Sequence, residues 1–400
     1  MTSKCSSIKE INAIMENRNY KNIDLDLLFL IMLFMIISCA SIYSSQKYLP
    51  YGDNFAIKQA IWFFAGLIVT SIVYLFDFEQ LRKLSPYLYF LGVLSLFVLM
   101  ISPETIAPEI KGTKAWFSIP GFSLQPSEFM KVFLILFLAS VISRHNENRD
   151  MRTLKSDFLL ILKTFGITLV PLALILVQPD AGTGMVVMCI AAGMLFLSGI
   201  DWKLVTLLIA VTVLMLSGLV YIYIYNSDFL LQVLDDYQMN RIHSWLDPFG
   251  FGQGIGYQLK QSILATGSGT FFGKGFNEGQ VIVPEAHSDF IFTVIGEEFG
   301  FIGGSVVLSL YFLLIFKIVA VALRNKGEFE SLIVSGVVAM LTFHIFENVG
   351  MVIGLVPITG IPLPLLSYGG SSVLGTLLAL SLVNNISAKT KEYMFSSREG

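Results

Sequence analysis

The sequence predicts an all-α protein that crosses a membrane many times. Of its 400 residues, 54% are hydrophobic and only 14% are charged, and the mean hydropathy is +0.72. These values lie far outside the composition of soluble domains. The apolar residues also form separate runs that reach or exceed the about 17 to 25 residues that a helix needs to cross a bilayer.

Ten such runs follow one another along the chain. The first follows a polar segment without an apolar core, so we expect a retained span and not a signal peptide. Very short turns separate the fifth, sixth and seventh runs, which makes these helices antiparallel neighbours. The predicted spans are residues 25–45, 59–76, 86–102, 127–143, 158–177, 183–200, 203–225, 290–322, 330–354 and 368–388.

The basic residues of the loops predict the orientation of these spans. Lys and Arg are more frequent in the alternate loops that include both ends of the chain, and such loops are typically cytoplasmic. We therefore expect cytoplasmic tails at residues 1–24 and 389–400, on either side of a transmembrane domain over residues 25–388. The outer loops then include residues 102–126, 178–182 and 226–289.

The loop at residues 226–289, between the seventh and eighth spans, is the largest segment that does not cross the membrane. Loops of this length in compact proteins are usually functional or disordered. Its Trp and Phe residues, placed among glycines, argue against disorder. Non-helical backbone at membrane depth is tolerated only where protein buries it or a water-filled cavity adjoins it. We therefore expect a cavity that opens to the outer side.

The segment from Val281 to Gly300 joins this loop to the eighth span. It holds Glu285, His287 and Asp289 within five residues. An acidic residue at a helix N-terminus is favoured by the helix dipole, so Asp289 fits a capping role. It also fits a second role, as a carboxylate at the mouth of a membrane cavity.

Charged side chains at the edges of spans are costly and therefore indicate function. Glu128 and Lys131 lie three residues apart at the start of the fourth span, where they can pair with each other. Lys58 and Arg241 add outer cations. Such a cavity suits a lipid-linked substrate with a phosphate group, because cations stabilise phosphate charge. Asp289 can then take a proton from a sugar hydroxyl.

The run from Ser367 to Ser372 opens the last span with two glycines and three serines. Small residues allow helices to pack closely, and exposed amides at a helix N-terminus can bind an anion. Both interpretations stay open.

Other kinds of site fit the sequence less well. Asp289 and Glu297 would lie about 12 Å apart along a helix, whereas the two carboxylates of glycosidases lie roughly 5 to 9.5 Å apart. The three cysteines form no CxxC pair and the four histidines are scattered. We therefore expect no structural metal site and no certain cofactor, with a divalent cation left open. No feature indicates binding to nucleic acid.

Five stretches of the chain form recognisable motifs. They are GTKAWFSIPGFSLQPSEFMK (112–131), QPDAGTG (178–184), WLDPFG to GYQLKQSILATGSGTFFGKGF (245–276), PEAHSDFIFTVIGEEFGFIG (284–303) and ENVGMVIGLVPITGIPLPLLSYGGSS (347–372). In this order they resemble the SEDS family over nearly the whole chain. The resemblance implies an enzyme of the bacterial cytoplasmic membrane that polymerises lipid II into glycan strands on the outer face. It also implies a class B penicillin-binding protein as partner, together with membrane proteins of the elongation complex.

The resemblance also implies roles for single residues. The essential loop aspartate of the family falls on Asp289, the lysine of its QPSExxK motif on Lys131, and a basic residue of its second helix on Lys58. A glutamine and serine pair falls on Gln261 and Ser262. The other candidate substrate-binding residues are Lys114, Gln125, Glu128, Arg241, Glu285 and His287.

One position departs from the family pattern. Ala115 stands before Trp116, where the family usually has an arginine. Lys114 can take its place, but a lysine lacks the bidentate fork of arginine.

The resemblance implies inverting glycosyl transfer. Asp289 deprotonates the 4-hydroxyl of the incoming sugar, and undecaprenyl pyrophosphate leaves. The charge of the leaving group is expected to meet Lys58, Lys114, Lys131 and Arg241. GMVIGLVPITGIPLPLLSYGGSS and GKGF resemble the elongation enzyme RodA, whereas PEAHSDFIFTVIGEE resembles the division enzyme FtsW. We favour a role in elongation and rod-shape maintenance.

Two alternatives from other classes remain. A lipid II flippase would use charged groups within the bilayer, for which Glu298 and Glu347 are the candidates. A non-catalytic scaffold of a division or elongation complex would tolerate substitution of Asp289.

Overall fold

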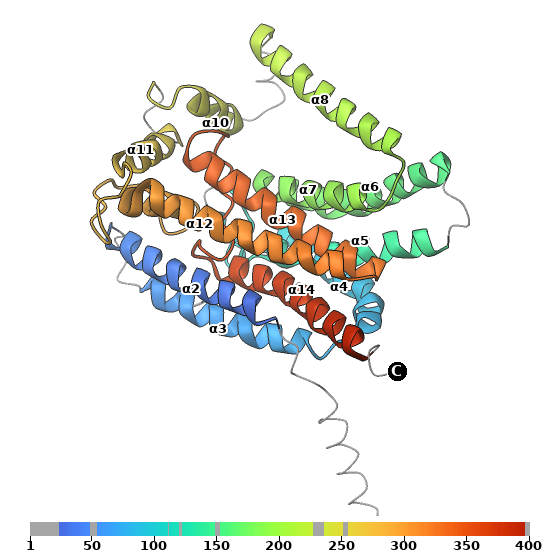
Figure 1. Ribbon diagram of the computed structural model, residues 1–400. Helices are drawn as coiled ribbons and strands as arrows, with labels where there is room; N and C mark the ends of the chain where they lie inside the picture. Colours follow the sequence, from blue (N-terminus) through green and yellow to red (C-terminus); the bar gives the residue numbers. More distant parts are fainter. Residues whose placement is uncertain are drawn as a thin grey trace, which may run out of the picture.

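The computed structural model describes residues 24–48, 54–110, 112–119, 122–148, 153–226, 236–250 and 255–396. Nearly all of the predicted N-terminal tail (1–24) and the last four residues of the predicted C-terminal tail therefore lie outside the described residues. Within the described ranges, nine helices are long and apolar enough to cross a membrane, and Ala181–Leu197 is a shorter apolar helix. The chain is an all-α polytopic membrane protein (Figure 1).

The ten apolar helices correspond one by one to the ten predicted spans. They are α2 (Leu25–Ser45), α3 (Phe55–Val73), α4 (Phe78–Ile101), α5 (Pro126–Glu147), α6 (Leu154–Val177), α7 (Ala181–Leu197), α8 (Trp202–Tyr225), α12 (Ile291–Arg324), α13 (Glu328–Val352) and α14 (Gly370–Ser396). Ser387 Oγ donates to Asp24 Oδ2 at 2.9 Å. Both ends of the described chain therefore lie at the same end of the bundle.

Three helices begin four or more residues earlier than the sequence analysis predicted, and a capping residue precedes each of them. α3 begins at Phe55 because the side chain of Asn54 accepts a hydrogen bond from the backbone N–H of Ile57. α4 begins at Phe78, where Gln80 Oε1 accepts from the backbone N–H of Asp77 at 3.0 Å. The predicted start at residue 86 was wrong because the first turns of α4 are polar and lie outside the apolar run. α6 begins at Leu154 because the side chain of Thr153 accepts a hydrogen bond from the backbone N–H of Ser156.

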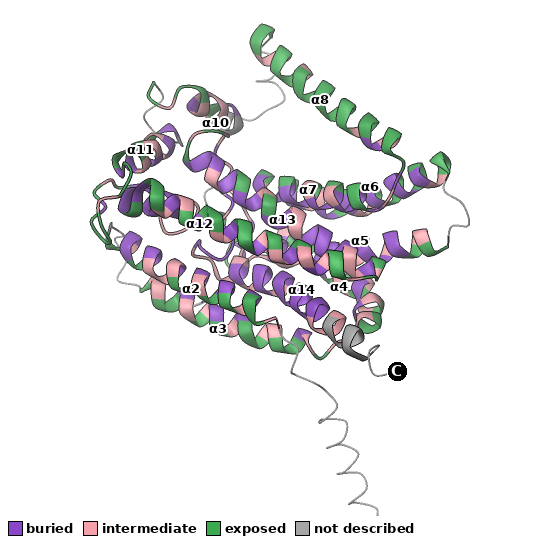
Figure 2. Ribbon diagram, in the orientation of Figure 1, coloured by how far each residue is buried: buried purple, intermediate pink, exposed green. Residues whose placement is uncertain are grey.

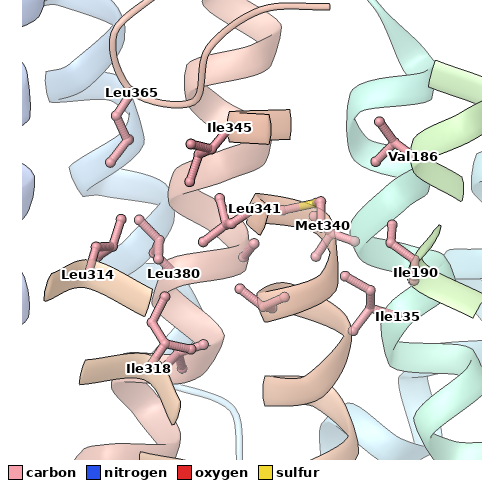
Figure 3. Close-up of a cluster of buried hydrophobic side chains, with 14 of the residues drawn as sticks. Ile135, Val186, Ile190, Leu314, Ile318, Met340, Leu341, Ile345, Leu365 and Leu380 are labelled. Carbon is pink, nitrogen blue, oxygen red and sulfur yellow. The ribbon is translucent and has the colours of Figure 1, made fainter. Parts of the chain in front are cut away.

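The centre of the bundle is formed by α5, α13 and α14. Figure 2 shows buried residues concentrated in these helices and exposed residues along α8. Of the residues of α8, all of which the structure describes, only Val205 is buried. In the core, Ile135, Met340 and Leu380 belong to one apolar cluster that joins α5, α13 and α14 (Figure 3). The ends of these central helices are therefore held in place by a packed core.

Shorter elements lie between the spans. The strands β1 (Phe117–Ile119) and β2 (Phe122–Leu124) form an antiparallel hairpin before α5, with Phe117 opposite Leu124. The long predicted loop contains α10 (Asp236–Leu246) and α11 (Ile255–Ser268), and a 3-10 turn, η2 (Gln46–Tyr48), follows α2. The 353–369 segment joins α13 to α14 without regular secondary structure.

Side chains from four helices hold the backbone of the 353–369 segment. Non-helical backbone at membrane depth needs hydrogen-bond partners within the protein. Carbonyl oxygens of this segment are bonded by side chains as follows: Ile361 by Asn348, Pro362 by His344, Pro364 by Tyr311, Leu366 by Ser38 and Ser367 by Gln59. Polar residues inside α2, α3, α12 and α13 thus fix the segment in place.

Candidate functional site

A cavity of about 580 Å³ opens where α5, α7, α12 and α14 begin. This volume lies within the usual range for small-molecule sites, about 300–1,000 Å³. Its charged and amide-bearing lining side chains are Gln125, Glu128, Asp180, Arg241, Gln258, Glu285 and Asp289. The 353–369 segment, the first residues of α14 and the loop before α5, with Ile110, Thr113, Trp116 and Ser123, also line the cavity.

Asp289 lines this cavity immediately before α12. Phe290, not Asp289, is the N-cap residue of α12, so the capping interpretation is wrong. The backbone carbonyl of Asp289 accepts from Asn348 Nδ2 at 2.7 Å. The carboxylate faces the 353–369 segment, because a Cβ atom built on Gly360 would lie 3.5 Å from Asp289 Oδ2. α13 therefore positions the aspartate against the opposite wall.

Glu297 holds the chain that leads to Asp289. Its side chain is 4% exposed. Its Oε1 atom accepts from Lys274 Nζ at 2.6 Å and from the backbone N–H groups of Gln280 and Val281 at 2.8 and 3.0 Å. A single buried carboxylate thus connects α12 to Lys274 and to the backbone at residues 280–281 of the preceding loop.

The other end of the same loop is bound to the start of α14. Ser367 Oγ donates to the carbonyl of Ser288 at 2.7 Å, and the N–H of Tyr368 donates to the carbonyl of His287 at 2.9 Å. Asp289 is therefore held between fixed points on α12, on α13 and at the end of the 353–369 segment, just before α14.

Glu128 and Lys131 form the ion pair that their spacing allowed. Lys131 Nζ lies 2.9 Å from Glu128 Oε1, and the two side chains are 2% and 3% exposed. Glu128 lines the cavity, whereas Lys131 lies behind it and contacts His344 Nε2 at 2.9 Å. The lysine is thus part of the support of the wall.

Gln125 and Asp180 join the starts of α5 and α7. Gln125 Nε2 donates to Asp180 Oδ2 at 3.2 Å, and Asp180 Oδ1 accepts from the backbone N–H of Thr183 at 3.1 Å. The N–H of Gln125 also donates to Ser371 Oγ at 2.9 Å. This side of the cavity is therefore closed by hydrogen bonds between three helix N-termini.

Arg241 is the one predicted phosphate-binding cation that lines the cavity. Its Nη1 atom donates to the carbonyls of Ile358 and Thr359 at 3.0 and 3.4 Å. The guanidinium therefore joins α10 to the 353–369 segment at the cavity wall.

Lys58 and Lys114, both within the described part of the chain, do not line the cavity. Lys58 is exposed at the start of α3, with Nζ 5.6 Å from the centroid of the Phe55 ring. Lys114 Nζ donates to the carbonyls of Met100 and Ser102. Lys114 is therefore turned toward the end of α4, and it does not replace the family arginine on the cavity wall.

Three further predicted residues, each in a described range, lie beside the cavity and not on its wall: Gln261, Ser262 and His287. Ser262 is fully buried and its Oγ donates to the carbonyl of Val352 at 2.7 Å, which joins α11 to α13. Gln258, one helical turn before Ser262, does line the cavity. His287 lines a smaller neighbouring cavity of about 100 Å³, and Glu285 lines both cavities.

The sequence analysis missed the wall formed by residues 358–362 and left the run at residues 367–372 with two open interpretations. The structure shows the close packing, and anion binding stays a prediction. Gly370 lines the cavity, and a Cβ atom built on it would lie 2.4 Å from Trp62, which requires close packing. The Gly and Pro residues of this segment were the available signal. Within the described ranges, no group of three or more His, Cys, Asp or Glu side chains could hold a metal ion.

Comparison with known proteins identifies the family. The model of the FtsW, RodA and SpoVE family, described as "Cell cycle protein", matches residues 20–392. The chain belongs to this family. It is 33% identical over 360 residues to a probable peptidoglycan glycosyltransferase FtsW from Trichlorobacter lovleyi, with 89% of each chain covered. It is also 32% identical over 366 residues to stage V sporulation protein E from Bacillus subtilis, covering 90% of this chain and 94% of the relative.

Solved structures show the same fold. One chain, from work on coordinated polymerization and crosslinking by a peptidoglycan synthase complex, matches with a TM-score of 0.75 and 27% identity, covering 93% of this chain and 99% of that chain. The rod shape determining protein RodA of Thermus thermophilus matches with a TM-score of 0.65 and 28% identity, covering 92% and 98%. FtsW and RodA both occur among these relatives, so the choice between division and elongation stays a prediction.

Proposed function

We propose that the protein is a peptidoglycan glycosyltransferase that polymerises lipid II at the outer face of the cytoplasmic membrane. The observation that carries the proposal is one cavity at the end of the helical bundle, where Asp289 and Arg241 share a wall with the N-terminus of α14. Relatives named as peptidoglycan glycosyltransferases support it. A partner transpeptidase of the class B penicillin-binding type is proposed because a structural relative comes from a peptidoglycan synthase complex.

In the proposed reaction, Asp289 acts as general base. It takes the proton of the sugar 4-hydroxyl, whose oxygen attacks the anomeric carbon of the second substrate with inversion. The bond between that carbon and the phosphate oxygen breaks, and undecaprenyl pyrophosphate leaves with the bonding electrons. Water then takes the proton from Asp289. A positioned base of this kind contributes about 10²–10⁴ in rate.

The structure supports a particular set of groups for the leaving diphosphate. Arg241 lines the cavity, and the N–H groups at the start of α14 add the positive end of a helix dipole. Lys58 is exposed at the start of α3 and remains a proposed contact for substrate that enters from outside. Lys131 does not line the cavity. It acts on the site by holding the carboxylate of Glu128, which does line the cavity.

The proposal is tested with purified protein, its partner transpeptidase and labelled lipid II. Asp289→Asn keeps the size of the side chain and removes its basicity, so we expect the glycan product to disappear. Asp201→Asn is the matched control, because Asp201 caps α8 and asparagine caps equally well. Both variants should retain the thermal midpoint of the parent.

Near-normal glycan synthesis by Asp289→Asn would refute the proposed base. A flippase would instead move labelled lipid II across liposomes without forming glycan, and a scaffold would do neither.

The cellular role and orientation are proposals as well. We propose an elongation role with both tails in the cytoplasm. Depletion should then produce round cells, whereas filaments would indicate division. Reporter fusions to the two tails should both report a cytoplasmic location.

A further inference from the structure

Lys131 is the only lysine or arginine that is buried in the part of the chain that the structure describes. An ammonium group has three hydrogens to donate, and each buried donor needs an acceptor. Glu128 Oε1 and His344 Nε2 both lie 2.9 Å from Lys131 Nζ. The lysine is therefore held between a carboxylate of the cavity wall and an imidazole behind it.

The partners of His344 determine its tautomer. His344 Nδ1 lies 3.2 Å from the carbonyl oxygen of Pro362, and a carbonyl can only accept. Nδ1 therefore carries the hydrogen, which leaves the lone pair on Nε2 to accept from the ammonium of Lys131. A doubly protonated ring would direct an N–H group at an ammonium group. His344 is thus neutral.

These contacts form a chain behind the cavity. Pro362 and Glu128 both line the cavity, and they come from the 353–369 segment and from α5. His344 and Lys131, which are 4% and 2% exposed, connect them through the interior. We propose that His344 is a positioning residue: its Nε2 lone pair fixes the Lys131 ammonium and thereby the Glu128 carboxylate on the cavity wall.

The two contacts of His344 are expected to differ in strength. A hydrogen bond to a charged group is worth about 10- to 150-fold in an equilibrium, and a neutral one about 2- to 10-fold. The contact with the Lys131 ammonium is the charged one, and the contact with the Pro362 carbonyl is neutral. Loss of the Nε2 acceptor should therefore lower the rate of glycan synthesis more than loss of the Nδ1 donor.

Two substitutions separate the contacts. In His344→Gln, the side-chain oxygen can take the place of Nε2 and accept from Lys131. In His344→Asn, the shorter amide can take the place of Nδ1 and donate to Pro362, but Lys131 loses its acceptor. Because the inference rests on the proposed function, initial rates and KM for lipid II are measured with the full-length protein and its partner transpeptidase.

We expect His344→Gln to remain within about threefold of the parental kcat, and His344→Asn to lose about 10- to 100-fold. KM should change little, and rates are compared at a temperature at which both variants remain folded, because loss of a buried hydrogen bond also lowers the thermal midpoint. In a Lys131→Met background, His344→Asn should cause no additional loss, since the two residues act as one unit. The reverse order of the variants, equal effects of both, or a fully additive loss would overturn the inference.

A second measurement does not depend on the enzyme activity. The chain has four histidines. Solid-state nitrogen NMR of histidine-labelled protein in lipid should therefore show one pair of ring-nitrogen signals, from Nδ1 and Nε2, that His344→Gln removes. The chemical shifts of that pair should be those of a neutral ring protonated at Nδ1. A ring protonated at Nε2 or at both nitrogens would refute the inference even if the protein polymerises lipid II. Failure of the proposed function would instead appear as the absence of glycan from the parental protein.

Discussion

Replacing Glu297 tests whether a buried carboxylate determines the position of the Asp289 loop. The Glu297 side chain is 4% exposed and accepts three hydrogen bonds, one of them from Lys274, whose side chain is 22% exposed. Glu297→Ala removes all three acceptor contacts at once. Glu297→Gln keeps an oxygen at nearly the same place but removes the negative charge.

The expected cost follows from burial. Removing one partner of a buried ion pair costs about 3–5 kcal/mol, because the other charge is left without compensation. Water reaches part of Lys274, so we expect about 2–4 kcal/mol for Glu297→Ala after screening. Glu297→Gln should cost about 1–3 kcal/mol, since hydrogen bonds to a charged group are replaced by neutral ones. The free energy of unfolding should therefore fall in the order parent, Gln, Ala.

The assay is equilibrium unfolding in mixed micelles, combined with the rate of glycan synthesis. An exposed ion pair provides the control: Glu79 lies 2.7 Å from Lys83, and both side chains are more than 70% exposed. Glu79→Ala should leave both quantities unchanged. If Glu297→Ala unfolds like the parent and keeps its rate, Glu297 does not hold the Asp289 loop and the reasoning fails.

Three further predictions follow from the geometry. Gly300→Ala should destabilise the protein by at least about 1–3 kcal/mol, because Gly300 has φ +63° and a Cβ there would lie 2.4 Å from a backbone nitrogen. Gly166→Ala has open space and should not lower the thermal midpoint. Asn348→Ala removes hydrogen bonds of 2.7 and 2.8 Å to both cavity walls, so kcat should fall about 10- to 100-fold; an unchanged kcat would contradict its positioning role. Arg241→Ala should raise the KM for lipid II more than Lys58→Ala, because only Arg241 lines the cavity; the opposite order would favour the assignment made from sequence.

The helices could be predicted from sequence because each span is defined by its own apolar residues. The first span, at residues 25–45, agrees with α2 to the residue. Boundaries failed where a polar cap preceded the apolar run, as at Asn54 and Asp77. A helix can extend into a polar segment when a cap satisfies its first N–H groups, and hydropathy does not report this.

The site was predictable only in part, because sequence places a residue at a helix end without giving the direction of its side chain. Asp289, Glu128 and Arg241 line the cavity, whereas Lys131, one turn after Glu128, lies behind it and is paired with Glu128. Lys114 illustrates the same limit, since it donates to carbonyls at the end of α4. Only the fold shows which of these cations can reach a substrate.

The 353–369 segment explains why polar residues within the spans do not all mark substrate contacts. Gln59 is fully buried, and it donates to Ser38 Oγ at 3.1 Å and to the carbonyl of Ser367 at 3.0 Å. Removing such a donor leaves a buried carbonyl unpaired at membrane depth, and the wall that faces Asp289 must then shift. Activity would therefore be lost although the replaced residue never touches the substrate. A change in KM, measured against a change in kcat, is what separates proposed substrate contacts such as Arg241 from the residues that hold the wall.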